Sequence, residues 1–96
     1  MSLLISSISS KKQDRGVTMI YGTKLLETDT EIFIAALAQT PVYVWSLDSL
    51  GVYYQVTSGS IVKYTPDAVQ IQSEKDLGLP LTQWYSREMN EFSISF

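Results

Sequence analysis

One helix signal with clear ends stands out in this 96-residue sequence. Thr28-Asp-Thr-Glu31 matches a capping box, in which the threonine hydroxyl accepts a backbone N–H and the glutamate reaches back to the cap. Pro41 disfavours helical geometry at the residue before it, so the helix ends there after about three turns. A strand over Glu31–Ile34 is the alternative, which the alanines disfavour. The apolar residues of this helix form one stripe that is expected to pack on a sheet: Ile32, Phe33, Ala36 and Leu37.

The remainder of the chain consists of short strand signals separated by turn residues. We expect strands over 17–27 (interrupted at Gly22), 41–47, 52–57, 60–64, 68–72, 81–86 and 91–96. Turns are expected over 48–51 and 65–67, a two-residue hairpin turn at Ser58-Gly59, a loop over 73–80 and a closing hairpin over 87–90. The sequence therefore predicts an α+β fold with one short helix packed on an antiparallel, strongly bent meander of five to six strands, or on a small barrel.

The first 18 residues differ from the rest of the chain, because they are serine-rich and lack aromatic residues. They are interpreted as an N-terminal arm that is mobile, or that adds a short edge strand over Leu3–Ile8. A second hypothesis treats them as non-native, with Met19 as the native start. Residues 19–96 are expected to form a single α+β domain, because 45% of the chain is hydrophobic and its length suits one core.

The chain contains no cysteine and no histidine. This composition excludes disulfides, zinc sites with such ligands, thiolate nucleophiles and imidazole bases. No glycine-rich phosphate loop occurs either, so we expect no enzyme activity, no cofactor and no metal. A net charge of −3 disfavours RNA as a partner, although it leaves RNA open. No apolar run is long enough to span a membrane, and the chain is expected to be cytoplasmic.

Aromatic residues are frequent on the expected strands, and two pairs of them are adjacent in sequence. Neighbouring residues of a strand point to opposite faces, so one member of each pair is available on the less buried side. Packing in the core is the simpler explanation for these residues. The sequence favours a small noncatalytic module, homo-oligomeric in one version, that binds protein through an aromatic sheet face or an edge strand. The candidate interaction residues are Tyr53, Tyr54, Tyr64, Trp84, Tyr85 and Arg87.

The order of elements resembles the Sm-like fold, which includes the bacterial RNA chaperone Hfq, over about 65 residues. The segment Gly59-x-Ile61-x-x-Tyr64 is similar to the family's glycine-x-hydrophobic-x-x-aromatic signature, and 84–87 resembles its Tyr-Lys-His segment. The resemblance implies a ring-shaped oligomer in which Tyr64, Tyr85 and Arg87 contact RNA. The sequence departs from the family at Thr65 and at 86–87, and a hairpin at Ser58-Gly59 breaks the family's long bent second strand.

Overall fold

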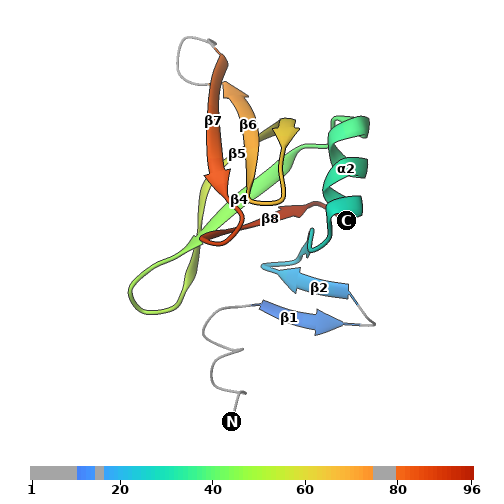
Figure 1. The fold of residues 1–96 in the computed structure, drawn as a ribbon. Coiled ribbons are helices and arrows are strands. Elements are labelled where there is room, and N and C mark those ends of the chain that lie inside the picture. Colours follow the sequence, from blue (N-terminus) through green and yellow to red (C-terminus); the bar gives the residue numbers. More distant parts are fainter. Residues whose placement is uncertain (1–10, 15–16, 75–79) are drawn as a thin grey trace.

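The computed structural model describes residues 11–14, 17–74 and 80–96, with side chains for 18–73 and 81–96. Among the described residues, three short strands precede one helix and five longer strands follow it (Figure 1). In chain order they are β1 (Lys11–Asp14), β2 (Val17–Ile20), β3 (Thr23–Leu25), α2 (Asp29–Ala38), β4 (Val42–Leu47), β5 (Tyr53–Tyr64), β6 (Ala68–Glu74), β7 (Pro80–Ser86) and β8 (Asn90–Ile94).

The strands of the described residues form one open, bent antiparallel sheet in the order β1-β2-β3-β8-β4-β5-β6-β7. The α+β class and the antiparallel sheet are therefore confirmed. The sheet has eight strands rather than five or six, because the chain over 17–27 folds as a hairpin and β1 pairs with β2. The two outermost strands are β1 and β7, which lie at opposite ends of the molecule in Figure 1.

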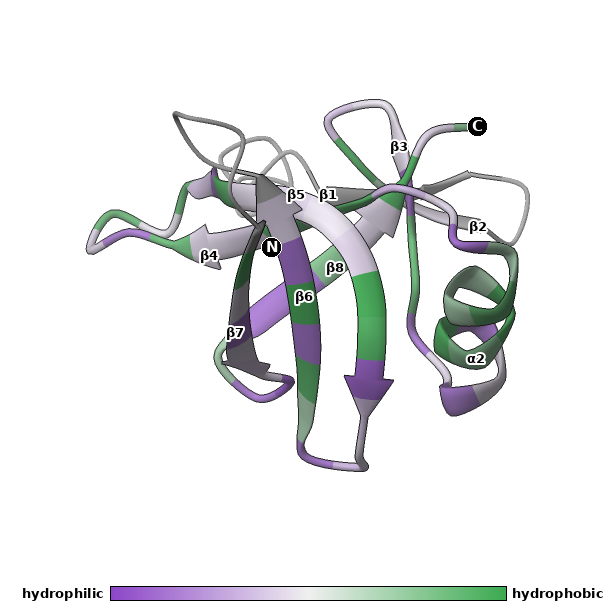
Figure 2. Cartoon of the chain, turned by 90° about the horizontal axis from the view of Figure 1, so that it is seen from above, coloured by the Kyte–Doolittle hydropathy of each residue, from purple (hydrophilic) through white to green (hydrophobic). Residues whose placement is uncertain are grey.

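The helix α2 begins and ends where the sequence predicts. Thr28 Oγ1 accepts the Glu31 N–H at 3.1 Å, and the Glu31 carboxylate accepts the Thr28 N–H at 3.0 Å, which completes the capping box. The predicted stripe is wrong in part, because Phe33 and Leu37 remain 49% and 73% exposed. A short helix that touches a curved sheet buries only a narrow row of side chains, here Ile32 and Ala35. Figure 2 shows apolar colour around much of α2.

The cap places the Glu31 carboxylate among several donors. Partial burial raises the pKa of Glu31, but the Glu27 and Thr28 backbone N–H groups, the Lys24 ammonium and the Thr28 hydroxyl outweigh it. The net pKa therefore lies below its ordinary value. A lowered carboxylate pKa stabilises the fold above the unfolded-state value of about 4.3, and this contribution is lost as the pH falls through the folded-state pKa.

Glu31→Gln is expected to lower the free energy of unfolding by about 0.5–1 kcal/mol at neutral pH, because the charged acceptor is lost from the first helical turn. The difference from wild type is expected to shrink toward zero as the pH falls below the folded-state pKa. Urea denaturation at several pH values measures this difference. Glu88→Gln, at an exposed turn, serves as the control and is expected to change stability by less than about 0.5 kcal/mol. A deficit that stays constant with pH contradicts the charge assignment.

The strand β5 runs unbroken through the predicted hairpin turn at Ser58-Gly59, so that prediction is wrong. Two-residue hairpin turns need positive φ, and among the described glycines only Gly22 and Gly51 have it. Instead β5 changes partners at this point. Residues up to Gly59 pair with β4 and those from Ser60 pair with β6, which bends the sheet over its own core.

The closing hairpin predicted over 87–90 is also wrong. The chain does turn at this point, but β7 pairs with β6 while β8 returns to pair with β4 and β3. The Ser86 side chain and carbonyl hold the turn, because Ser86 Oγ accepts the Glu88 and Met89 N–H groups and the carbonyl accepts from Asn90 Nδ2. Long-range pairing with β4 therefore replaces the local pairing that the short segment between the two predicted strands suggested.

Other turns follow the sequence closely. Tyr21-Gly22 forms a tight turn with positive φ at both residues, where Gly22 predicted an interruption. Asp48 Oδ1 accepts the N–H groups of Leu50 and Val52, and Gly51 has a φ of 80°. The predicted loop over 73–80 is shorter than expected, because β6 extends to Glu74; residues 75–79 lie outside the described residues.

The main core lies between α2 and the concave side of the bent sheet. Its buried members come from the helix and from β4, β5, β6 and β8. Alternation along β6 shows this directly, because Val69 and Ile71 are buried while Gln70 and Gln72 are not, which gives the banded strand in Figure 2. The buried residues of the main core are Leu26, Ile32, Ala35, Val42, Val44, Ile61, Val69, Ile71 and Phe92.

A second, smaller core attaches the N-terminal strands to the other face of the sheet. Trp45 packs there with Ile20 and Leu25, and the Tyr21 ring lies 5.3 Å from the Trp45 ring. The fully buried Ser93 accepts the Trp45 Nε1–H at 2.7 Å, and its hydroxyl lies 2.7 Å from that of Thr23. Thr23 in turn donates to the Ile20 carbonyl at 2.6 Å, which completes a chain of hydrogen bonds. The predicted Leu3–Ile8 strand lies outside the described residues.

Candidate functional site

Three of the six predicted interaction residues are tyrosines that pack against a core. Tyr64 and Tyr85 are half-buried against the main core, and Tyr53 packs against the smaller one. Much of each ring is therefore occupied by intramolecular packing. The packing explanation accounts for these three residues.

The other two aromatic candidates are exposed. Tyr54 on β5 is 51% exposed and Trp84 on β7 is 45% exposed, and both lie beside residues that face the sheet interior. The adjacent pairs thus behave as strand alternation predicts, with one inward and one outward member each. Trp84 carries the stronger case for a functional role, because it lies on the outermost strand of the sheet.

Arg87 connects three parts of the chain. Its Nη1 donates to Asp29 Oδ1 at 2.6 Å and to the Thr65 carbonyl at 3.0 Å, and its own N–H donates to the Asp67 carbonyl at 2.8 Å. The side chain is only 17% exposed. Arg87 therefore joins the start of α2, the turn between β5 and β6, and the turn after β7.

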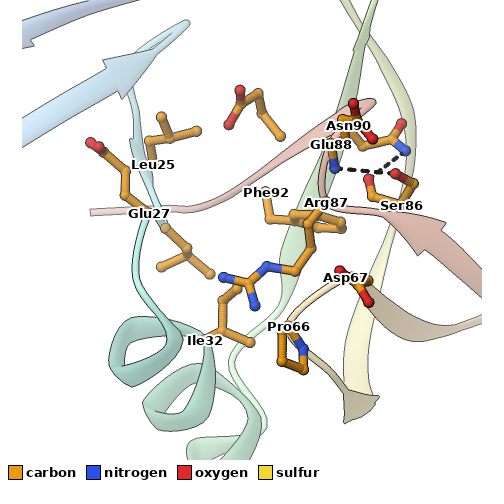
Figure 3. Close-up of a pocket in the computed structure, with 12 residues that line it drawn as sticks. Leu25, Glu27, Ile32, Pro66, Asp67, Ser86, Arg87, Glu88, Asn90 and Phe92 are labelled. Carbon is orange, nitrogen blue, oxygen red and sulfur yellow. Dashed lines mark hydrogen bonds between the residues drawn. The ribbon is translucent and has the colours of Figure 1, made fainter.

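Arg87 also crosses a pocket of about 650 Å³ (Figure 3). Its floor is apolar, with Leu26, Ile32 and Phe92, whereas its rim carries Glu27 and Asp67 among other acidic residues. The guanidinium already has acidic and carbonyl partners. Among the described residues no group of three or more acidic side chains is arranged to hold a metal ion. The pocket lies where the start of α2, the turn between β5 and β6 and the turn after β7 meet.

The outer edge of β7 has different chemistry, because no described strand pairs with it. All residues of β7, Pro-Leu-Thr-Gln-Trp-Tyr-Ser, are uncharged. Leu81 lies on the same face as the buried Val69 and Ile71 yet is 40% exposed, since it pairs with Ser73 beyond the end of the core. Charged residues normally protect such an edge from pairing.

The register fixes which backbone groups of β7 point outward. The Arg87 N–H donates to the Asp67 carbonyl, directly after the Ala68–Ser86 pair. Hydrogen-bonded pairs alternate along an antiparallel ladder, so every second residue from Arg87 back to Leu81 faces β6. The N–H and C=O groups of Thr82 and Trp84 therefore point away from β6. The Ser86 carbonyl shares this direction but already accepts from Asn90 Nδ2.

The opposite end of the sheet has a contrasting composition. β1 consists of Lys-Lys-Gln-Asp, so three of its four residues are charged. Charged side chains on an outermost strand oppose pairing with another chain. Of the two outermost strands, only β7 lacks this protection.

A further apolar surface lies between α2 and β5. A groove of about 400 Å³ runs there, and the exposed Phe33, Leu37 and Val62 contribute to it. This surface was missed at the sequence level, because all of the apolar helix residues in the stripe were expected to be buried. Leu81 and Gln83 of the β7 edge were missed as well. The absence of charged residues over 80–86 could have indicated an unprotected edge. The local sequence does not show, however, that this strand lies at the end of the sheet.

Comparison of the chain with protein-family models, curated proteins and solved structures finds no match in any of the three. Within the part of the chain that the structure describes, no helix combines the length and apolar character needed to cross a membrane. The functional assignment therefore depends on the geometry of the described residues.

Proposed function

We propose that this chain is a small noncatalytic cytoplasmic module that binds protein by accepting an extended segment at the outer edge of β7. The observation that supports this most directly is the combination of outward backbone groups at Thr82 and Trp84 with a strand that has no charged residue. In strand addition, backbone hydrogen bonds provide affinity and side chains on either face provide selectivity. Leu81 and Trp84 are the exposed apolar side chains on the two faces.

A titration with a lysine-flanked valine–threonine peptide tests this function. We expect slow amide exchange at Thr82 and Trp84 in the presence of the peptide, because their N–H groups then have partners, while exchange at Gln83 does not depend on the peptide, since its N–H already faces β6. Exchange measured by NMR at tens of micromolar protein gives the readout, and a charged peptide of low β-propensity is the control. Thr82 and Trp84 amides that exchange at the unprotected rate both with and without the peptide contradict the proposed function.

A second candidate function is an Sm-like RNA-binding role. It is favoured by one observation, since β5 is a single long bent strand that contains Gly59 and Tyr64, so the break expected at Ser58-Gly59 is absent. The net charge of −3 and the engaged Arg87 guanidinium oppose it. Oligo(U) RNA added at low salt in the same titration separates the two functions. An RNA role requires the NMR signals of Tyr64, Tyr85 and Arg87 to shift when the RNA is added, whereas strand addition requires no shift on adding RNA.

A further inference from the structure

We infer that the segment accepted by β7 is the β7 strand of a second copy of this chain, paired antiparallel about a two-fold axis at Gln83. This inference rests on the proposed function, because it names the partner for the same edge. Isologous pairing of this kind uses one surface twice and closes after two copies. Its geometry follows from three properties of β7 that are independent of one another.

The first property is the position of the available backbone groups. Thr82 and Trp84 both have an outward N–H and an outward C=O. An axis at Gln83 places Thr82 of each copy opposite Trp84 of the other. The two symmetry-related pairs each form two N–H···O=C bonds. All four residues in the centre of the contact are then satisfied by one another.

The neighbouring registers are poorer for identifiable reasons. An axis at Thr82 places Trp84 opposite Pro80, which has no N–H to donate. An axis at Trp84 places Thr82 opposite Ser86, whose carbonyl already accepts from Asn90 Nδ2 at 2.9 Å. The axis at Gln83 places Pro80 opposite Ser86, so the missing N–H meets the carbonyl that is already engaged and neither Thr82 nor Trp84 loses a partner. It also overlaps the two strands along their whole length.

The second property is the distribution of apolar side chains. With the axis at Gln83, Leu81 lies opposite the partner copy's position 85 on the face that carries the main core. The half-buried Tyr85 would thus be covered by a leucine, and the main cores of the two copies would become continuous. On the other face, Trp84 lies opposite Thr82. Pairs of an aromatic with an aliphatic or β-branched residue stabilise neighbouring strands.

The third property is charge. Because β7 has no charged residue, pairing it with itself brings no like charges into register. Pairing β7 with β1 of a second copy would place the charged Lys-Lys-Gln-Asp strand in the contact and would leave free edges for further addition. The self-pairing of β7 is therefore the association that the composition of the two outermost strands favours.

The lack of cysteine in this chain allows a direct test by single-cysteine cross-linking. In the proposed register the two Gln83 residues form a non-hydrogen-bonded pair with Cα atoms about 4.5 Å apart, within the range of about 4.4–6.8 Å that a disulfide spans. The two Thr82 residues are offset by about 7 Å along the strands and cannot be bridged. Thr82→Cys is thus a matched control on the same exposed strand. Ser49→Cys, in an exposed turn, gives the rate of cross-linking by random collision between copies.

Under mild oxidation we expect Gln83→Cys to form a covalent dimer at least about tenfold faster than either control, because a paired thiol meets its partner at a millimolar effective concentration. Non-reducing electrophoresis and sedimentation velocity give the readout. Equal rates for all three variants, or faster cross-linking of Thr82→Cys, overturn the inference. If the valine–threonine peptide protects Thr82 and Trp84 while Gln83→Cys stays monomeric, self-pairing fails and the proposed function stands. If neither occurs, both fail.

Discussion

Gly59→Ala is expected to lower the free energy of unfolding by about 2–3 kcal/mol, which is a large part of the stability of a domain of this size. A Cβ atom at this position would overlap the carbonyl oxygen of Gln72 and press on the carbonyl carbon and on the Ile71 side chain. The overlapping atom belongs to the backbone of β6, so no side-chain rotation relieves it. Accommodating the methyl group requires β5 and β6 to separate where the sheet bends.

Urea denaturation followed by tryptophan fluorescence measures this loss. Ser58→Ala is the matched control, because Ser58 is the preceding residue of the same strand and is exposed. It is expected to change stability by less than about 0.5 kcal/mol. A Gly59→Ala protein as stable as the control would show that β5 does not approach β6 this closely and would remove the explanation for the bend.

Ser93→Ala is the second substitution with a large expected effect, a loss of about 2 kcal/mol. The Ser93 hydroxyl is fully buried and accepts the Trp45 Nε1–H, so its removal leaves that donor without a partner in an apolar environment. It also removes the hydroxyl beside Thr23. Because Thr23 begins β3, the N-terminal strands are expected to open before the main core does.

Thermal unfolding and the emission of Trp45 measure both effects. Ser95→Ala is the control, since Ser95 lies just beyond β8, is exposed and contacts the Tyr43 hydroxyl at 3.1 Å. Water can replace that contact, so a change under about 0.5 kcal/mol is expected. If Ser93→Ala is no more destabilising than Ser95→Ala, the buried hydrogen-bond chain is not what attaches the N-terminal strands.

Features determined by a few neighbouring residues could be predicted from the sequence. The limits of α2 follow from the Thr28–Glu31 capping box and from Pro41, and the turn at 48–51 follows from Asp48 and Gly51. Each depends on contacts within about four residues, so tertiary structure has little opportunity to override them.

Features that depend on distant pairing could not be predicted. Ser58-Gly59 resembles a hairpin turn, yet glycine is needed there for a close approach to Gln72 on β6. A strand was correctly expected within 91–96, but its alternation did not predict the fully buried Ser93, and its partner β4 lies more than forty positions earlier in the chain. Local sequence shows that a strand forms and does not show which strand it pairs with.

The candidate site was predicted in part. Trp84 was named from its position beside Tyr85, and strand alternation accounts for its exposure. Arg87 was named as an interaction residue, but its ion pair with Asp29 spans a distance that no local pattern reveals. Gln83, on which the proposed two-fold axis lies, has no distinctive chemistry of its own. Its significance comes only from the register between β6 and β7.

The lysine-rich β1 strand has a consequence for the size of any assembly. If two copies join at β7, both ends of the combined sheet of described strands are β1, which carries the sequence Lys-Lys-Gln-Asp. Such ends resist addition of another copy, so the sheet stops growing at two chains instead of extending into a fibril. In that assembly the β1 strands would end the sheet on both sides, so the exposed β7 edge would not lead to aggregation.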